Sequence, residues 1–256
     1  MNSIIEWSST EKNPVLGTSE IHVWRAFLSL DHASLRHLES TLAEDEKTRA
    51  ARFIFERDRD HFVAARGILR DLLATYISRA PGAIKFVYGP HGKPAVADAD
   101  ANLAIRFNLS HSHGIAVIAI GFERELGVDV EMLRPDFAGE DIAKRYFSEK
   151  EIGELGALPK ELRTEGFFRC WTRKEAYIKA RGDGLHVPLD SFSVSLSADR
   201  FPALSSADQS RWRIESFVPS REPKPGYAAA VVAQGNDWAT RHFEWKPTKT
   251  ETTEEE

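Results

Sequence analysis

The sequence predicts an α+β protein built as two similar α+β halves in one chain. Strand-like runs and stretches of helical periodicity occur in blocks, as in α+β folds, rather than in strict alternation. The same order, a strand, then helices, then a run of strands, occurs twice. At 256 residues the chain is long enough for two such units and a sizeable core.

The elements of each half follow from local periodicity and turn residues. In the first half we expect a strand over residues 21–28, helical sequence over 44–78, and strands around 84–88, 105–109 and 115–120. In the second half we expect a strand over 126–131, helices within 139–155 and 165–181, and strands around 192–196, 212–218 and 227–232. A polar stretch at 121–125 marks the junction, which predicts an N-terminal half over 1–122, a C-terminal half over 123–246 and a disordered polar tail over 247–256.

Composition limits the possible functions. Hydrophobic content of 42% and charged content of 29% are typical of a soluble globular protein, and a net charge of −5 argues against a nucleic-acid binder. The single cysteine, Cys170, excludes an internal disulfide and fits a reducing cytoplasm. Since the chain has no secretory segment and no long apolar run, we expect a cytoplasmic protein without a membrane partner.

An acid–apolar–acid triplet, Asp129-Val130-Glu131, lies in the strand predicted over 126–131. Side chains two residues apart on a strand project from the same face, so the two carboxylates repel each other unless a positive charge lies between them. A hard cation such as Mg²⁺, which commonly carries phosphates, meets that need. The alternative is a solvent-facing strand edge with no metal.

The helix predicted over 165–181 carries charge where a purely structural helix would be apolar. Phe168, Trp171, Glu175 and Lys179 recur at helical spacing and share one face. Burying the carboxylate of Glu175 and the ammonium of Lys179 costs on the order of several kcal/mol unless each is paired or bound to an ion. The alternative is an exposed salt bridge between Glu175 and Lys179 worth about 0.3–0.5 kcal/mol. Gly182 is the expected end of the helix.

A third segment, Asn108-Leu109-Ser110-His111-Ser112-His113, leads into the apolar strand at 115–120. Asn, Ser and His are short donors suited to phosphate oxygens. The alternating His111 and His113 also raise the possibility of zinc, but no cysteine or carboxylate with ligand spacing is nearby. A structural role is the alternative for either histidine.

Taken in order, these three segments resemble the Sfp-type 4′-phosphopantetheinyl transferases. The family pattern is N-x-S-H, then G-[IV]-D-[IV]-E, then W-[TS]-x-K-E-[AS]-[FYL]-x-K, closing with a Gly-Leu turn. The resemblance covers roughly residues 44–233 and includes Gly92-Lys93-Pro94, which is similar to the family's G-K-P turn. It implies the pseudo-dimeric 4′-phosphopantetheinyl transferase fold, in a monomer with internal pseudo-two-fold symmetry.

The activity implied by the resemblance is Mg²⁺-dependent transfer of 4′-phosphopantetheine from coenzyme A to a serine of an apo acyl or peptidyl carrier protein. Adenosine 3′,5′-bisphosphate is the other product. The resemblance makes Asp129, Glu131 and Glu175 the metal ligands, and Asp129, Glu175 and Lys179 the catalytic residues. Lys179 would support the leaving phosphate, whereas the base is either Glu175 itself or a metal-bound water that Glu175 orients.

The phosphates of coenzyme A need cationic partners. By resemblance, the candidates are basic or hydrogen-bonding residues of the first half: Lys47, Arg49, Arg52, Arg66, Lys93, Ser110 and His111. The alternative for the basic residues after position 44 is a solvated, salt-bridged helical surface, because acids are interleaved among them. For Lys93 the alternative is a simple hairpin turn.

The docking surface for the carrier protein is less clear from the sequence. The stretch 132–147 mixes apolar and basic residues, although Tyr146 and Phe147 also fit an amphipathic helix that faces the core. Two other classes remain as alternatives: a non-catalytic coenzyme A-binding or phosphoprotein-binding module, and a metal-dependent nuclease or phosphohydrolase. The resemblance points to secondary metabolism without specifying the carrier or its pathway.

Overall fold

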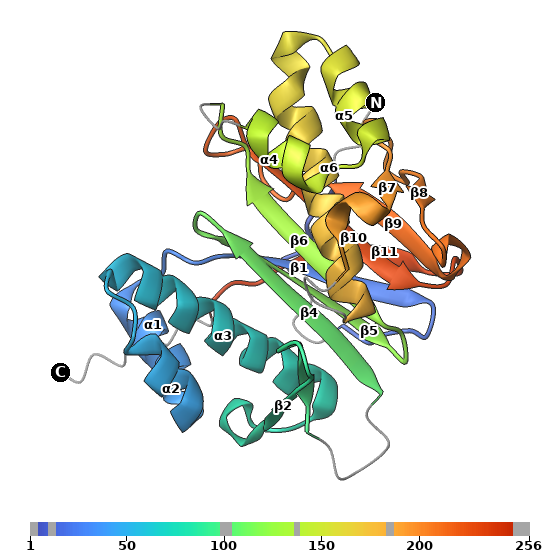
Figure 1. The fold of residues 1–256 in the computed structure, drawn as a ribbon. Coiled ribbons are helices and arrows are strands. Elements are labelled where there is room, and N and C mark those ends of the chain that lie inside the picture. The colour runs from blue at the N-terminus through green and yellow to red at the C-terminus, as the bar shows by residue number, and fades with distance from the viewer. Residues whose placement is uncertain (1–4, 10–13, 98–103, 136–138, 183–186, 248–256) are drawn as a thin grey trace, which may run out of the picture.

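Two β-sheets pack face to face between outer helices in the computed structural model, which describes residues 5–9, 14–97, 104–135, 139–182 and 187–247 (Figure 1). The first sheet has the strand order β11-β1-β5-β4, and the second has the order β6-β10-β9. Two ribbons, β2-β3 and β7-β8, complete the strand pairs of the described residues. This mixture of sheets and helices confirms the predicted α+β class.

The strands lie close to their predicted positions. They are β1 Glu20–Phe27, β2 Phe86–Tyr88, β3 Pro94–Val96, β4 Ile105–Ser112, β5 Ile115–Phe122, β6 Leu126–Met132, β7 Ser193–Val194, β8 Leu204–Ser205, β9 Trp212–Phe217, β10 Tyr227–Gln234 and β11 Ala239–Glu244. Three of them, β3, β8 and β11, lie outside the predicted strand ranges. A two-residue turn, His113-Gly114, joins β4 to β5, and both residues have positive φ (45° and 86°), the conformation of a tight type I′ hairpin.

The helices cover the outer faces of the two sheets. They are α1 His32–Ser40, α2 Glu44–Ala50, α3 Glu56–Ile77, α4 Gly139–Tyr146, α5 Glu149–Ala157 and α6 Lys160–Arg181. The helical sequence predicted over 44–78 is divided into α2 and α3, and α1 was not predicted. As predicted, α6 ends at Gly182, which adopts a left-handed conformation and donates its N–H to Ile178 O. None of the described helices is both long and apolar enough to span a membrane.

Three apolar clusters hold the layers together. One lies between α1–α3 and the first sheet, and a second lies between α4–α6 and the second sheet. The third joins the two sheets, with Val23 of β1 and Val117 of β5 packed in the same cluster as Val128 of β6 and Val231 of β10. Each half therefore has its own core, and a shared core fixes one sheet against the other.

The last strand crosses back to the first half. β11 pairs in parallel with β1, with Ala239 opposite Glu20 and Glu244 opposite Arg25. Residues 239–244 therefore complete the first sheet, whereas the sequence-based boundary assigned all of 123–246 to the second half. The physical reason for this crossing is that, without β11, the backbone groups of β1 on the side away from β5 would lack hydrogen-bond partners. The tail predicted over 247–256 falls, after Pro247, outside the described residues.

Candidate active site

The two acidic residues of β6 face β4, the nearest strand of the other sheet. The Ser110 hydroxyl donates a hydrogen bond to Asp129 Oδ1 at 2.8 Å, and the Ser112 hydroxyl donates one to Glu131 Oε2 at 2.8 Å. Both carboxylates therefore lie on one side of β6, as strand alternation predicts. Asp129 is buried and Glu131 is partly exposed.

A third side chain of β4 continues this contact between the sheets. The backbone N–H of Val128 donates to Asn108 Oδ1 at 2.9 Å, and both groups are buried. Asn108, Ser110 and Ser112, at every second position of β4, thus hold β6 by side-chain hydrogen bonds. From the sequence, Ser110 and His111 are the expected phosphate contacts of this segment; in the structure the Ser110 hydroxyl bonds Asp129.

Helix α6 brings two more charged groups to the same place. Lys179 Nζ donates to Asp129 Oδ1 at 2.6 Å and to Ser110 Oγ at 3.2 Å. The helix can approach β6 this closely because Gly127 has no side chain. A Cβ at Gly127 would lie 2.3 Å from both Ala176 O and Ala180 N, inside van der Waals contact with the backbone of α6.

The three carboxylates are close enough to affect one another. Burial raises the pKa of Glu175, and the charges of Asp129 and Glu131 raise it further, while Lys179 offsets part of the rise. Burial also raises the pKa of Glu131, with Asp129 as the second cause. The site therefore concentrates negative charge that Lys179 neutralises only in part.

Whether these residues suit a metal ion can be judged from their unsatisfied groups. Asp129 Oδ2 is buried and has no hydrogen-bond partner, so one carboxylate oxygen is left for a cation. Within the part of the chain that the structure describes, no group of three or more His, Cys, Asp or Glu side chains is arranged so that it could hold a metal ion. Carboxylate oxygens are suitable ligands for a hard cation, but in this structure Asp129, Glu131 and Glu175 do not form a complete coordination site.

A small hollow of about 220 Å³ opens beside α6. Residues of α6 and of the turn before β3 line it, together with one residue of β4: His91, Gly92, Lys93, Pro94, Asn108, Glu175, Ile178, Lys179 and Gly182. Glu175 and Lys179 are therefore accessible to a ligand, as catalytic groups need to be.

Basic groups from three elements, α2, α3 and α6, lie near His111 at the end of β4. Desolvation lowers the pKa of His111, and the charges of His61, Lys179 and Arg49 lower it further. Each of these neighbours therefore lies near enough to repel a proton from the ring. Such a concentration of cationic groups attracts anions. His61, on α3, was missed by the sequence analysis because it stands alone in a mixed-charge helical stretch and belongs to no motif.

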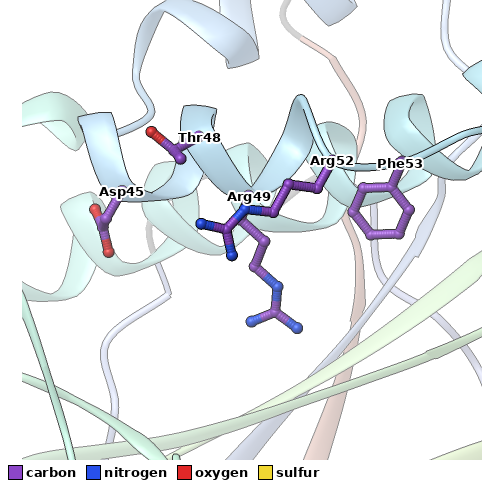
Figure 2. A pocket seen from close by; sticks show the side chains of 5 residues that line it. All are labelled: Asp45, Thr48, Arg49, Arg52 and Phe53. Atoms are coloured by element: carbon purple, nitrogen blue, oxygen red, sulfur yellow. The ribbon is translucent and has the colours of Figure 1, made fainter.

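A second, wider hollow of about 700 Å³ lies over α2 and the turn after it. Figure 2 shows the side chains that line it: Asp45, Thr48, Arg49, Arg52 and Phe53. The guanidinium of Arg49 lies over the ring of Phe62, 5.3 Å from its centroid, which fixes the direction of the side chain. Lys47 is exposed and pairs with Glu44 at 3.0 Å.

Two of the predicted phosphate ligands are already engaged within the protein. Arg66 Nε lies 2.6 Å from Glu46 Oε1, and its Nη2 donates to the Tyr88 hydroxyl. Lys93 Nζ bonds Glu125 Oε2 at 3.1 Å and also reaches the carbonyls of residues 126 and 180. The side chain of Arg66 braces α3 against α2, whereas Lys93 ties the first half to β6 and α6.

Comparison with known proteins relates both halves of the chain to one family. A family model of the 4′-phosphopantetheinyl transferase superfamily matches residues 125–232, and one of the N-terminal region of 4′-phosphopantetheinyl transferase matches residues 29–122. The 4′-phosphopantetheinyl transferase HetI of Nostoc sp. is 38% identical, over 93% of this chain and 98% of its own. The 4′-phosphopantetheinyl transferase Sfp of Bacillus subtilis is 32% identical, over 78% of this chain and 85% of its own. Among solved structures, the holo-[acyl-carrier-protein] synthase (AcpS) of Thermotoga maritima is 23% identical, with a TM-score of 0.34, over 43% of this chain and 62% of that chain.

Both family models and both curated relatives are those of enzymes that transfer a phosphopantetheinyl group. The chain belongs to the 4′-phosphopantetheinyl transferase superfamily, and the resemblance found in the sequence motifs is confirmed.

Proposed function

We propose that this protein transfers the 4′-phosphopantetheine arm of coenzyme A to a serine hydroxyl of an apo acyl or peptidyl carrier protein. The serine oxygen forms a bond to the β-phosphorus of the diphosphate while the bond from that phosphorus to the bridging oxygen breaks. The serine proton passes to a base, and adenosine 3′,5′-bisphosphate leaves. The products are the holo carrier protein and the free nucleotide.

The observation that carries this proposal is the meeting of Lys179 and Glu175 of α6 with Asp129 of β6, beside the hollow next to α6. Lys179 Nζ lies 2.6 Å from Asp129 Oδ1, and its positive charge can also stabilise the negative charge that develops on the leaving phosphate. Glu175 lines the hollow and has a raised pKa, which makes it a better proton acceptor than an ordinary carboxylate.

Asp129, Glu131 and Glu175 are the residues we propose for Mg²⁺. The unpartnered Oδ2 of Asp129 and the mutual electrostatic repulsion of the three carboxylates support this assignment. When bound, Mg²⁺ would neutralise charge on the diphosphate. Ser110 and Ser112 hold two of these carboxylates in place from β4.

For the 3′-phosphate of coenzyme A, we propose Arg49 and Arg52, which line the 700 Å³ hollow, together with His111 and Lys47. The electrostatic proximity of Arg49 to His111 supports a shared anion between them. His61, next to the β4–β5 turn, belongs to the same basic group. A Cβ placed on Gly114 of that turn would lie 3.7 Å from Cε1 of the His61 ring. Arg66 and Lys93 contribute by holding the neighbouring elements, because their charges are paired.

The carrier protein is expected to approach near α4. Phe147 is buried and Tyr146 packs its ring against Trp171, so these two belong to the core. Lys144 and Arg145 remain exposed there and suit an acidic partner. The repeated arrangement of a sheet and a 22-residue helix, α3 or α6, supports a monomer with internal pseudo-two-fold symmetry. The one free cysteine supports a reducing, cytoplasmic setting.

Incubation of the protein with Mg²⁺, coenzyme A and several apo carrier proteins tests the proposal directly. We expect one carrier at least to gain the mass of a single phosphopantetheine arm, at a serine. Breakdown of coenzyme A without a carrier would instead favour a phosphohydrolase, and binding without either reaction would favour a coenzyme A-binding module. The family membership and the position of the partly exposed Glu175 and Lys179 beside the hollow disfavour both alternatives.

A further inference from the structure

A small cavity of about 120 Å³ lies between α6 and the strands β9 and β10, and none of its lining residues lines the hollow beside Glu175 and Lys179. Three arginines line it, Arg169, Arg173 and Arg221, together with one acidic residue, Glu165. The cavity is well below the size of a pocket for a drug-sized ligand or a nucleotide, so its volume suits a small ion.

Arg173 brings a buried positive charge to this cavity without a matching carboxylate. Its side chain is fully buried. Its guanidinium donates to Ser216 Oγ at 2.8 Å and to the carbonyls of residues 195, 197 and 199. Among the described residues, no carboxylate lies within ion-pair distance of it. Carbonyl dipoles satisfy the hydrogen bonds, but they leave the net charge uncompensated.

Arg169, one turn earlier on α6, adds a second charge of the same sign. Its Nε is buried and has no hydrogen-bond partner, and its only ion pair among the described residues is a 3.5 Å contact with the half-exposed Glu165. Burial lowers the pKa of Arg173 to about 10, and the charge of Arg169 is the next cause. Two adjacent guanidinium groups that repel each other and leave an unused donor are favourable surroundings for an anion.

We propose that this cavity is a binding site for a small oxyanion of the phosphate class, held by Arg169, Arg173 and Arg221. The anion supplies the missing negative charge and accepts the free Nε–H of Arg169. It also links α6 to the segment before β10, on which Arg221 lies. This site is separate from the residues proposed for coenzyme A and does not depend on that proposed function.

Calorimetric titration with inorganic phosphate tests the site, because both anion sites can be weakened independently. Arg169→Gln and Arg221→Gln are expected to weaken one phosphate-binding event about tenfold or more, as the loss of a charge-assisted hydrogen bond predicts. Arg49→Gln, which alters the basic group around His111, should leave that event unchanged. Arg36→Gln, an exposed arginine on α1, controls for the loss of one positive charge.

Arg169→Lys keeps the charge and should bind phosphate better than Arg169→Gln, provided that circular dichroism shows both to be folded. Since Arg221 is exposed, its variant tests the site even if Arg169→Gln is destabilised. The proposal is overturned if the wild type binds no phosphate, if all variants bind equally, or if only Arg49→Gln loses binding.

Discussion

Lys179 Nζ lies 2.6 Å from Asp129 Oδ1, so the last turn of α6 is joined by an ion pair to a strand 50 positions earlier in the chain. The same ammonium reaches Ser110 of β4, which belongs to the other sheet. A single charged group therefore connects both halves of the fold with the acidic centre. Its position depends on the close approach of α6 to β6.

Gly127→Ala is expected to destabilise the protein and to reduce its activity together. The added Cβ would lie 2.3 Å from backbone atoms of α6, which cannot move aside as a flexible side chain can. The helix must shift, and Glu175 and Lys179 shift with it away from Asp129. Thermal unfolding and carrier-modification rates measure the two effects.

A matched control for this variant is Gly153→Ala in α5. Nothing lies within 4 Å of a Cβ at Gly153, so this change should keep activity and raise stability by up to about 1 kcal/mol through helix propensity. Full activity in Gly127→Ala would show that the close contact between α6 and β6 is not required.

Glu175→Gln is expected to lose about two orders of magnitude in turnover or more while its melting temperature rises in the absence of Mg²⁺. In the folded protein the pKa of Glu175 lies above its ordinary value of 4.5. The folded state therefore holds this proton more tightly than the unfolded state, and stability falls as pH rises through the interval between the two values. The neutral glutamine removes that penalty at pH 7.

The gain in melting temperature should shrink as the pH is lowered toward 4.5, where the wild-type carboxyl is itself protonated. Differential scanning fluorimetry with a chelator present, at several pH values, measures it. A lower melting temperature for Glu175→Gln at pH 7 would contradict the prediction that Glu175 is electrostatically destabilising.

Sequence periodicity was enough to predict the two strands and the helix that carry the site, because β4, β6 and α6 each have a clear local pattern. It was not enough for β11, whose short polar–apolar sequence becomes a strand only by pairing with β1. Likewise, Gly127 appears in the sequence as part of a motif, but the reason for it is the backbone of α6, which lies about 50 positions away.

Long-range pairing also explains why the sequence could not separate basic residues that are paired within the protein from those that are available to a ligand. Arg49 and Arg66 look alike in a helical run of mixed charge, yet Arg66 is paired with buried Glu46 and Arg49 is near His111. His61 reaches the site only because α3 passes the β4–β5 turn. Such partners depend on how helices pack, which no local pattern specifies.

Mg²⁺ is expected to raise the melting temperature of the wild type, and the rise should be absent or much smaller in Asp129→Asn. A cation bound to the folded state alone stabilises it by mass action, and the free Oδ2 of Asp129 is the group proposed to receive it. Asp141→Asn, an exposed acid on α4, is the control and should respond to Mg²⁺ as the wild type does. An equal rise in Asp129→Asn would remove Asp129 from the proposed metal site.

Glu46→Gln is expected to cost about 3–5 kcal/mol of unfolding free energy, because it removes a buried carboxylate that two arginines share. Glu46 Oε1 lies 2.6 Å from Arg66 Nε, and Glu46 Oε2 lies 2.7 Å from Arg70 Nε. Denaturant unfolding measures the loss. Glu44→Gln, on the exposed side of the same helix, should change stability by roughly 0.5 kcal/mol or less. A similarly small effect at both positions would mean that the buried pair does not hold α2 to α3.

Lys179→Ala is expected to lower turnover by about 10²–10³-fold, more than it lowers affinity for coenzyme A, since leaving-group charge develops mainly in the transition state. It should also move the acid limb of the pH–rate profile to higher pH. Burial raises the pKa of Glu175, and the Lys179 charge offsets part of that rise, so its removal raises the pKa further. A higher pH is then needed to ionise the base. Lys179→Arg retains the charge and should keep the wild-type limb. Single-turnover rates across pH, with calorimetric coenzyme A affinities, separate the effects; an unmoved acid limb with mainly weakened binding would make Lys179 a ground-state phosphate contact.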